Sequence, residues 1–372
     1  MTGGGYYEFF AGGGMARAGL GAGWRCLFAN DFDPKKAIAY RANWGAEHLC
    51  VADVASLAAA DLPGMADLVW ASFPCQDLSL AGGGAGLRGA RSGTFWPFWA
   101  LVKGLAAQGR APRLVVLENV VGALTSHGGR DFAAIGRALA ETGYRFGAVV
   151  VNAADFVPQS RARLFFVAVR GDVDIPAGLV GARPSARWHP PALVEARARL
   201  RGWVWWRLPE PARRVATLAD LIEAEPSGVV WRAAAETAGL LASMTPVNRA
   251  KVEAARAAGG RRVGTVYKRT RAGVVRAEVR FDDVAGCLRT PAGGSSRQTI
   301  LVVEDGQVRS RLLSPREAAR LMGLPDSYRL PTNYNEAYHL AGDGVAVPVV
   351  RHLAAHLLEP LLAAPDGARA AA

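Results

Sequence analysis

The sequence predicts an α/β protein with a doubly wound, mostly parallel sheet covered by helices on both faces, followed by a second, smaller domain. Segments of strand length alternate with Ala-rich helical stretches through the first 170 residues. The alternation stops near residue 171, where Gly and Pro become frequent. Helical periodicity returns after residue 310. We therefore expect a first domain at 1–175, a second at 176–309, and a helical segment at 310–372 that packs back on the first.

Each expected element follows from its local pattern. Strands are expected at 6–10, 25–29, 50–54, 66–73, 113–119, 148–153 and 163–169. Helices are expected at 35–43, at 130–143 with Gly143 at the C-terminal end, from Pro315 with Ser314 as N-cap, and over 345–362. Residues 263–281 have the pattern of a β-hairpin.

The charge is unevenly distributed along the chain. Of the 372 residues, 51% are hydrophobic, so the chain can bury a large core. Lys and Arg number 44 and Asp and Glu 32, for a net charge of +12. Residues 176–309 hold 22 of the basic residues against 12 acidic ones, and five of the ten tryptophans. Basic residues interleaved with aromatic ones indicate a polyanion such as nucleic acid, and a merely solvated basic face is the alternative.

No metal site or disulfide framework is expected. The four cysteines are far apart, and none has a second Cys or a His at the spacing of zinc ligands, which suits a reducing cytosol. His352 and His356 have the i, i+4 spacing of a metal pair but lack a third ligand, so we expect a structural role for them. Without a basic leader or an apolar run of about 18 residues, the protein is expected to be cytoplasmic and not to cross a membrane.

Polar residues follow the strands that are expected to be parallel, and the ends of such strands form the ligand site of an open sheet. The first strand leads into Gly12–Gly14, where a ligand can approach the backbone. The third glycine of a dinucleotide fingerprint is missing, because Arg17 stands at its position. Asp31 can accept hydrogen bonds from a ribose, and Phe32 can stack on an adenine. We therefore expect an adenosine without phosphates, and a simple tight turn is the alternative.

Three further strand ends carry reactive groups. Cys75 precedes a Gly-rich stretch suited to closing over a substrate, so its thiolate is a candidate nucleophile, although most free cysteines are buried hydrophobes. Glu118 ends an apolar strand, where a carboxyl can hold a proton or serve as a simple cap. Arg161 and Arg163 are expected on one side of an extended segment, gripping one planar acceptor, with ordinary surface charge as the alternative.

These motifs, in this order, resemble those of the bacterial DNA (cytosine-5) methyltransferases. The resemblance covers nearly the whole chain: FFAGGG, NDFD, ADV, SFPCQDLS, RSGTF, LENV and QSRAR precede a variable stretch, which LRTPAGGSSRQT and GDGVAVPVV follow. It implies that 1–175 is a Rossmann-like domain that binds S-adenosylmethionine. It also implies that 176–309 is a target recognition domain, with its variable part at about 176–285.

The resemblance implies methyl transfer from S-adenosylmethionine, which leaves S-adenosylhomocysteine, to C5 of a cytosine flipped out of double-stranded DNA. It implies that Cys75 adds to C6, that Glu118 protonates N3, and that Arg163, helped by Arg161, holds O2 of the base. No metal is implied. The cofactor contacts implied are Phe10, Gly12, Gly13, Gly14, Asp31, Phe32, Asp53, Val54, Pro74, Asp343, Gly344 and Val345. DNA contacts are expected from Gln76, Ser79, Arg88 and Arg91.

One motif departs from the family pattern, and three other functions stay open. The family usually has Gly-Asn before a small residue, whereas Asp343 follows Gly342 here and adds a negative charge near the cofactor carboxylate. A transfer RNA methyltransferase, a catalytically inactive DNA-binding homologue and a nicotinamide or flavin oxidoreductase are the alternatives. The basic stretch argues against the transfer RNA enzyme. The complete set of catalytic residues argues against the inactive homologue, and the missing third glycine argues against the oxidoreductase. We expect a monomer near the bacterial nucleoid, with or without a cognate restriction endonuclease.

Overall fold

The computed structural model describes residues 3–74, 86–89, 92–271, 273–289 and 297–364. The chain forms two compact units. Unit 1 is Met1–Asn152, Ala162–Pro211 and Val345–Ala372, and unit 2 is Ala153–Arg161 and Ala212–Gly344. The expected boundaries are therefore corrected. Residues 176–211 belong to unit 1, where Trp206 donates to the carbonyl of Val167, and 310–344 belong to unit 2, where the first of them complete a β-hairpin.

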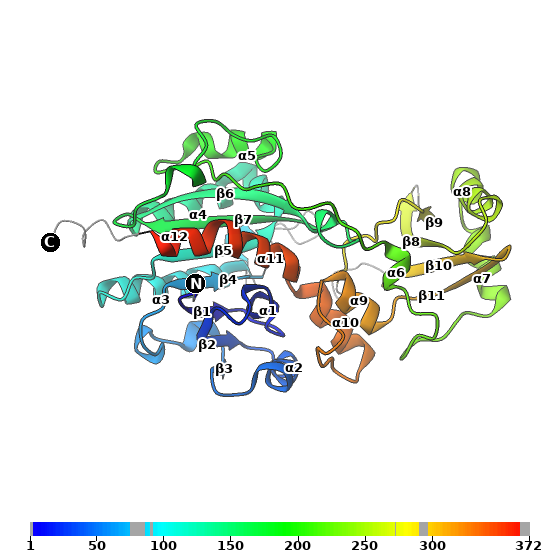
Figure 1. Ribbon diagram of the computed structural model, residues 1–372, viewed down its shortest axis with the longest axis horizontal. Coiled ribbons are helices and arrows are strands. Elements are labelled where there is room, and N and C mark those ends of the chain that lie inside the picture. The colour runs from blue at the N-terminus through cyan, green and yellow to red at the C-terminus, as the bar shows by residue number, and fades with distance from the viewer. Residues whose placement is uncertain (1–2, 75–85, 90–91, 272, 290–296, 365–372) are drawn as a thin grey trace. The chain divides into compact units, whose positions relative to one another are not determined.

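Unit 1 contains a seven-stranded sheet with the order β3-β2-β1-β4-β5-β7-β6 (Figure 1). The pairs among β1 to β5 are parallel, and β7 is antiparallel to both β5 and β6. Its strands are β1 Gly5–Phe9, β2 Arg25–Asp31, β3 Leu49–Val51, β4 Leu68–Ala71, β5 Leu114–Val120, β6 Tyr144–Asn152 and β7 Ala162–Arg170. The expected doubly wound sheet is confirmed, and the structure adds the strand order and the antiparallel pair.

Helices cover both faces of this sheet, because all five residues of β1 are buried although successive side chains point to opposite faces. Tyr7 and Phe9 pack in one cluster with Phe98 and Phe132, so α3 Phe95–Ala107 and α4 Arg130–Glu141 cover that face. On the other face lie α1 Met15–Leu20, α2 Pro34–Trp44, α11 Val347–Leu353 and α12 Glu359–Ala363, of which α11 and α12 cross in front of the strands in Figure 1. The short α5 Pro191–Ala196 belongs to the same unit.

The chain returns to unit 1 through α11, as the sequence predicted. α11 packs directly on α1, and the fit is close: a Cβ at Gly19 would lie 2.3 Å from Cβ of Val350. Any larger residue at Gly19 would push the two helices apart. A π-helical turn at Ala354–Leu358 joins α11 to α12. The helix that supports the glycine turn is therefore covered by residues from the far end of the sequence.

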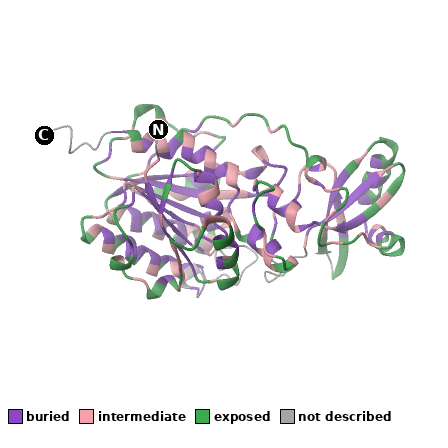
Figure 2. Ribbon diagram, turned by 60° about the horizontal axis from the view of Figure 1, so that its bottom comes forward, coloured by how far each residue is buried: buried purple, intermediate pink, exposed green. Residues whose placement is uncertain are grey.

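One helical stretch among the described residues, 334–363, is long and apolar enough to cross a membrane by length and composition alone. This differs from the sequence expectation that no such stretch exists. Of its most apolar window, 56% is buried inside the protein, and the core helices of globular proteins pass the same test. Figure 2 shows buried residues in purple and exposed ones in green along the helices of the protein. The stretch is weak evidence for a membrane span.

Unit 2 is built on a four-stranded antiparallel sheet of order β11-β10-β8-β9. Its strands are β8 Arg262–Arg271, β9 Val274–Arg280, β10 Thr299–Glu304 and β11 Gln307–Leu312, and its helices are α6 Leu218–Leu221, α7 Ala234–Ala242, α8 Pro246–Ala257, α9 Pro315–Leu321 and α10 Tyr334–Asp343. The expected hairpin at 263–281 is confirmed. So is the helix start at Pro315, where the side chain of Ser314 accepts from the backbone N–H of Glu317.

Candidate active site

The carboxyl ends of β1, β2, β4 and β5 lie side by side at one edge of the unit 1 sheet. Phe9 pairs in register with Asn30 of β2 and with Ala71 of β4, and Ala71 pairs with Leu117 of β5. The polar segments that the sequence placed after these strands therefore leave the sheet at the same edge, where open α/β sheets bind ligands.

The turn after β1 has left-handed backbone at three positions, with φ of 58° at Phe10, 55° at Gly12 and 76° at Gly14. A non-glycine residue rarely adopts this conformation, and such strain gathers at ligand sites. At Gly14 a Cβ would also lie only 2.4 Å from Nε1 of Trp44. That nitrogen donates to the carbonyl oxygen of Gly13 at 3.0 Å. The turn is thus held in one shape that requires glycine.

Asp31 at the end of β2 fixes the same turn. Its Oδ2 accepts from the backbone N–H of Gly12 at 2.7 Å and its Oδ1 from that of Asp33 at 2.9 Å. A carboxylate has about four acceptor positions, so two remain for a ribose. Beside it, Asn30 donates to the carbonyls of Cys50 and Ala52, which ties the ends of β2 and β3 together. The sequence did not single out Asn30, although an amide at the end of a buried strand is a usable signal.

The residues expected at the adenine end show mixed exposure. The ring of Phe32 is 69% exposed beside the buried Asp31, which leaves an apolar face open to a flat partner. Asp53 caps the following turn by accepting from the backbone N–H of Ala55. Val54 is buried. Contacts of these residues with a cofactor stay predictions.

The end of β4 is tied to the end of β5. Asn119 is 3% exposed, and its Nδ2 donates to the carbonyl oxygen of Phe73 at 3.2 Å. This bond fixes the backbone just before Pro74, and the sequence analysis missed it. Beyond Pro74, the predicted residues Cys75, Gln76, Ser79 and Arg91 and the side chain of Arg88 lie outside the described residues.

Glu118 and Arg163 form an ion pair at this edge of the sheet. Oε1 of Glu118 lies 3.1 Å from Nε of Arg163, and the two side chains are 8% and 15% exposed. The contact arises because β7 runs antiparallel to β5, which pairs Arg163 with Val120, two residues beyond Glu118. The sequence predicted both residues at the site, and the structure brings them together. A carboxyl and a guanidinium at one strand end can contact neighbouring edges of one planar base.

Arg161 does not join this pair. It belongs to unit 2 and is 3% exposed. Its Nη2 donates to the carbonyls of Gly342 at 2.9 Å and Gly344 at 2.6 Å, and its Nη1 donates to that of Leu288 at 3.1 Å. The expectation that Arg161 and Arg163 grip one acceptor is wrong, because backbone carbonyls of two segments occupy the Arg161 fork. Arg161 is a positioning residue of unit 2.

Gln159 acts beside Arg161 in unit 2. It is fully buried, its Nε2 donates to the carbonyl of Leu321 at 2.7 Å, and its Oε1 accepts from the backbone N–H of Leu288 at 3.2 Å. The sequence quoted this glutamine within QSRAR without giving it a role. Both of its neighbours are distant in sequence, so no local pattern could reveal them.

The final motif lies at the boundary between the units. Asp343 and Gly344 end unit 2, and Val345 begins the last part of unit 1. Asp343 is exposed, whereas Val345 is 3% exposed. That these residues line the cofactor stays a prediction.

A polar cluster anchors residues 86–89, which follow the Gly-rich stretch. The backbone N–H of Leu87 donates to Oδ1 of Asp131 at 3.3 Å, and Oδ2 of Asp131 bonds Nδ1 of His127 at 2.7 Å and Oγ of Ser126 at 2.5 Å. Burial raises the pKa of Asp131, but the hydrogen bonds from Ser126 and His127 outweigh it and hold this pKa below its usual value. The ionised carboxylate therefore holds this anchor at neutral pH.

The five tryptophans at 176–309 were expected to lie with the basic residues of a polyanion-binding segment, but not all of them do. Trp188 and Trp206 are 2% and 1% exposed, and their indole N–H groups donate to backbone carbonyls within unit 1. Trp203 packs on the ring of Phe146 in the same unit. Of the five, only Trp231 lies in unit 2. The aromatic part of the argument for a polyanion is therefore corrected, because these rings build the core instead.

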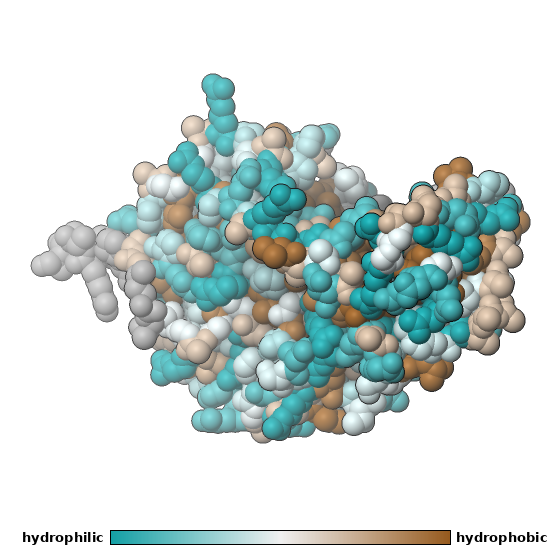
Figure 3. Space-filling model, turned by 45° about the vertical axis from the view of Figure 1, so that its right-hand side comes forward, coloured by the Kyte–Doolittle hydropathy of each residue, from teal (hydrophilic) through white to brown (hydrophobic). Residues whose placement is uncertain are grey.

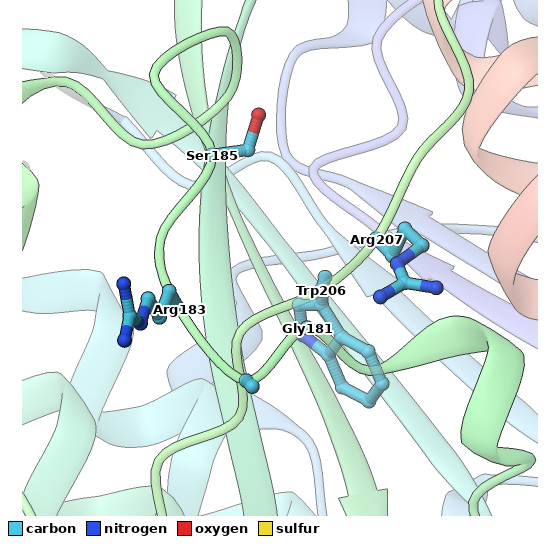
Figure 4. A pocket seen from close by; sticks show the side chains of 6 residues that line it. Gly181, Arg183, Ser185, Trp206 and Arg207 are labelled. Carbon is cyan, nitrogen blue, oxygen red and sulfur yellow. The ribbon is translucent and has the colours of Figure 1, made fainter.

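A shallow pocket of about 320 Å³ lies among residues 181–207 of unit 1. Figure 4 shows Arg183 and Arg207 on different sides of it, with Trp206 between them. None of its lining residues is among those predicted to bind cofactor or base. Nearby, Nε2 of His352 bonds the carbonyl of Pro209, and the His352 ring packs on Trp188, which is the structural role expected of it.

The Rossmann-like sheet, with its glycine turn and its strand-end ion pair, defines an enzyme of the methyltransferase class. Comparison with known proteins makes the class specific. The model of the C-5 cytosine-specific DNA methylase family matches residues 6–359, and the chain belongs to this family of DNA (cytosine-5) methyltransferases. The family resemblance found in the motifs is thereby confirmed.

Bacterial relatives match the chain over nearly its full length. Type II methyltransferase M.NlaX of Neisseria lactamica is 29% identical over 96% of this chain and 97% of its own. Type II methyltransferase M.HhaI of Haemophilus parahaemolyticus is 24% identical over 95% of this chain and 94% of its own.

Solved structures support the fold. The Dnmt2 methyltransferase of S. pombe has a TM-score of 0.59 and 18% identity, covering 96% of this chain and 99% of its own. The methyltransferase EhMeth of Entamoeba histolytica has a TM-score of 0.60 and 14% identity, covering 96% and 98%.

Proposed function

We propose that this protein transfers the methyl group of S-adenosylmethionine to C5 of a cytosine in a specific duplex DNA sequence, through a covalent bond between Cys75 and C6. The observation that carries the proposal is the Glu118–Arg163 pair at the end of β5, next to the strand that leads into Pro74 and Cys75. The pair supplies an acid and a cation at the end of the strand next to β4, in a chain of this family, and this supports the proposal.

The residues of unit 1 fit S-adenosylmethionine. The left-handed turn at Phe10, Gly12 and Gly14 presents open backbone, Asp31 keeps spare acceptor positions for ribose hydroxyls, and the exposed ring of Phe32 offers a stacking face. The bound substrate supplies an electrophilic methyl group on a sulfonium.

The cytosine needs activation because its C5 is a weak nucleophile. The thiolate of Cys75 adds to C6, while the carboxyl of Glu118 gives a proton to N3 and Arg163 holds O2. C5 then attacks the methyl carbon, the carbon–sulfur bond breaks, and S-adenosylhomocysteine remains. Loss of the C5 proton and departure of Cys75 restore the aromatic ring. Arg161 contributes by holding the backbone at Leu288, Gly342 and Gly344 together within unit 2.

The target base must leave the helix to reach these groups. In this proposal Gln76, Ser79, Arg88 and Arg91 contact the DNA from the Gly-rich stretch behind the flipped base. The protein acts as a monomer in the bacterial cytoplasm at the nucleoid. Its relatives are named Type II methyltransferases, so a cognate restriction endonuclease is a possible partner that the reaction does not require.

A trapping experiment tests the covalent route. Duplex DNA with 5-fluorocytosine at the target is expected to hold the enzyme in a denaturation-resistant adduct, because fluorine cannot leave as a proton does. Cys75→Ala is expected to abolish both adduct and methyl transfer while duplex binding persists, and Cys50→Ala serves as the matched control. Residual transfer above about one percent in Cys75→Ala would contradict the covalent step. Transfer to transfer RNA in place of duplex DNA would overturn the substrate assignment.

A further inference from the structure

A two-stranded ribbon in unit 2, formed by residues 267–271 and 274–278 and called the ribbon 267–278, extends beyond its sheet. β10 pairs with β8 only as far as Val266, whereas β8 and β9 stay paired out to Arg271 and Val274. On the other side β9 is the edge strand of the sheet. The described side chains at 268–270 and 274–276 are exposed on both faces of the ribbon. The outer part of the ribbon, 268–270 and 274–276, is therefore exposed on both faces, whereas Ala277 nearer the sheet is buried and bridges Met244.

Positive charge concentrates in this hairpin. Unit 2 carries a net charge of +6, and residues 262–280 supply +5 of it, with six Lys and Arg against a single Glu. The side chains of Lys268 and Arg276 have no hydrogen bond or ion pair within the described part of the chain, whereas Arg269 pairs with Glu278 at 3.3 Å. Hydrophilic and hydrophobic side chains lie side by side on the face of the molecule that Figure 3 presents.

The register of the ribbon places two like charges opposite each other. Arg269 and Arg276 are cross-strand partners and share one face, and such a pair is unfavourable in the isolated protein. Val274, two residues before Arg276, lies on the same face and is 50% exposed, and Val275 on the other face is 56% exposed. Glu278 balances the charge of Arg269 but leaves Arg276 without an ion pair among the described residues, so this charge beside exposed valines indicates a partner that is both anionic and partly apolar.

We infer that the ribbon 267–278 enters the major groove of the DNA duplex, with Arg276 reading a base edge and Lys268 neutralising a phosphate. The inference rests on the proposed function. A two-stranded ribbon fits this groove, where Arg binds guanine O6 and N7 with two hydrogen bonds and an apolar side chain contacts the methyl group of thymine. A ribbon that is exposed on both faces meets phosphates on both walls of the groove.

Substitutions in the ribbon separate its two roles. Arg276→Ala is expected to weaken binding to the target duplex by about 5- to 150-fold and to relax the methylated sequence at one base pair. Arg276→Lys keeps the charge without the planar fork, so it is expected to relax the sequence while leaving the salt dependence unchanged. Lys268→Ala is expected to weaken all duplexes alike and to lower the slope of log affinity against log salt by about 1.

The measurements are duplex binding at several salt concentrations and bisulfite sequencing of a random-sequence duplex library treated with each variant. Arg249→Ala, which removes another exposed arginine of unit 2, controls for charge alone. The ribbon assignment is overturned if Arg276→Ala matches Arg249→Ala in both target preference and affinity while the parent protein methylates the library. If the parent protein leaves duplex DNA unmethylated, the proposed function itself fails, and the two failures are thereby distinguished. Unchanged thermal unfolding of each variant shows that the substitutions act on binding.

Discussion

Each unit buries an Arg–Glu pair, but the two pairs differ in what remains open. In unit 2, Arg311 and Glu317 are 0% exposed, and both oxygens of Glu317 are doubly engaged. The second bond on each oxygen comes from a backbone N–H, that of Glu223 at 2.8 Å and that of Ser314 at 2.7 Å. In unit 1, Glu118 meets Arg163 at a strand end with part of its surface open.

The difference between the two pairs separates a structural role from one in binding a substrate. A carboxylate with all acceptor positions filled cannot bind a ligand, but it joins β11, α9 and the segment after α6. A carboxylate with one charged partner and free acceptor positions is available to a substrate. The two buried glutamates therefore differ in how many of their hydrogen-bonding positions are filled, and only Glu118 keeps positions for a ligand.

Glu118→Gln gives the largest expected effect. The amide cannot donate the proton that N3 requires, so single-turnover methyl transfer is expected to fall by about 10²- to 10⁴-fold. Duplex binding and the urea midpoint are expected to change little. Glu317→Gln is the matched control, because the same change in unit 2 should lower stability and spare the chemical step of the folded fraction. Equal losses of activity in both variants would break the comparison.

Glu317→Ala comes next in size. It leaves the Arg311 guanidinium buried without its carboxylate, which is expected to cost about 3 to 5 kcal/mol. Urea unfolding and hydrogen exchange at α9 and β11 measure this loss. Replacing Arg311 and Glu317 together by Met and Leu is expected to restore most of the stability, since an apolar pair needs no desolvation. A double variant as unstable as the single one would show that the pair itself is stabilising.

Arg161→Lys and Arg163→Lys compare a structural arginine with a site arginine at two positions separated by one residue. Lysine keeps the charge but loses the fork, so Arg161→Lys is expected to destabilise unit 2 by about 2 kcal/mol through lost charged hydrogen bonds. Arg163→Lys is expected to slow methyl transfer with little change in stability. Paired unfolding and kinetic measurements test both, and a kinetic defect in a fully stable Arg161→Lys enzyme would return Arg161 to the catalytic group.

The smallest effect, counted per pH unit, is a pH dependence that belongs to unit 1. Glu8 on β1 is 1% exposed, its Oε2 has no hydrogen-bond partner within the described residues, and burial raises its pKa from 4.5 to about 8. The folded state thus holds the proton more tightly than the unfolded state, so this stabilisation is complete below pH 4.5 and is lost as the pH rises through 8.

Glu8→Gln is expected to flatten this slope, which is at most about 1.4 kcal/mol per pH unit. Urea midpoints between pH 5 and pH 8 measure it. An identical slope in the variant would show that Glu8 does not carry the proton.

The sequence could predict the sheet, the strand-end site and the family, because alternating apolar segments and short motifs are local signals. It could not predict that Arg161 and Arg163 have different tasks. Their spacing puts them on one side of an extended segment, and only the carbonyls of Leu288, Gly342 and Gly344 draw Arg161 away. The domain boundaries failed for a similar reason. Composition marked a change near residue 171, whereas the later tryptophans complete the core of unit 1.

The order in which the chain is made gives unit 1 a timing constraint. α1 carries the glycine turn at its start and buries Met15, Ala16 and Leu20, and α11 covers it. A ribosome synthesises all of unit 2 before it reaches α11. In a nascent polypeptide the helix that carries the glycine turn therefore stays without its α11 neighbour until translation has passed Leu353.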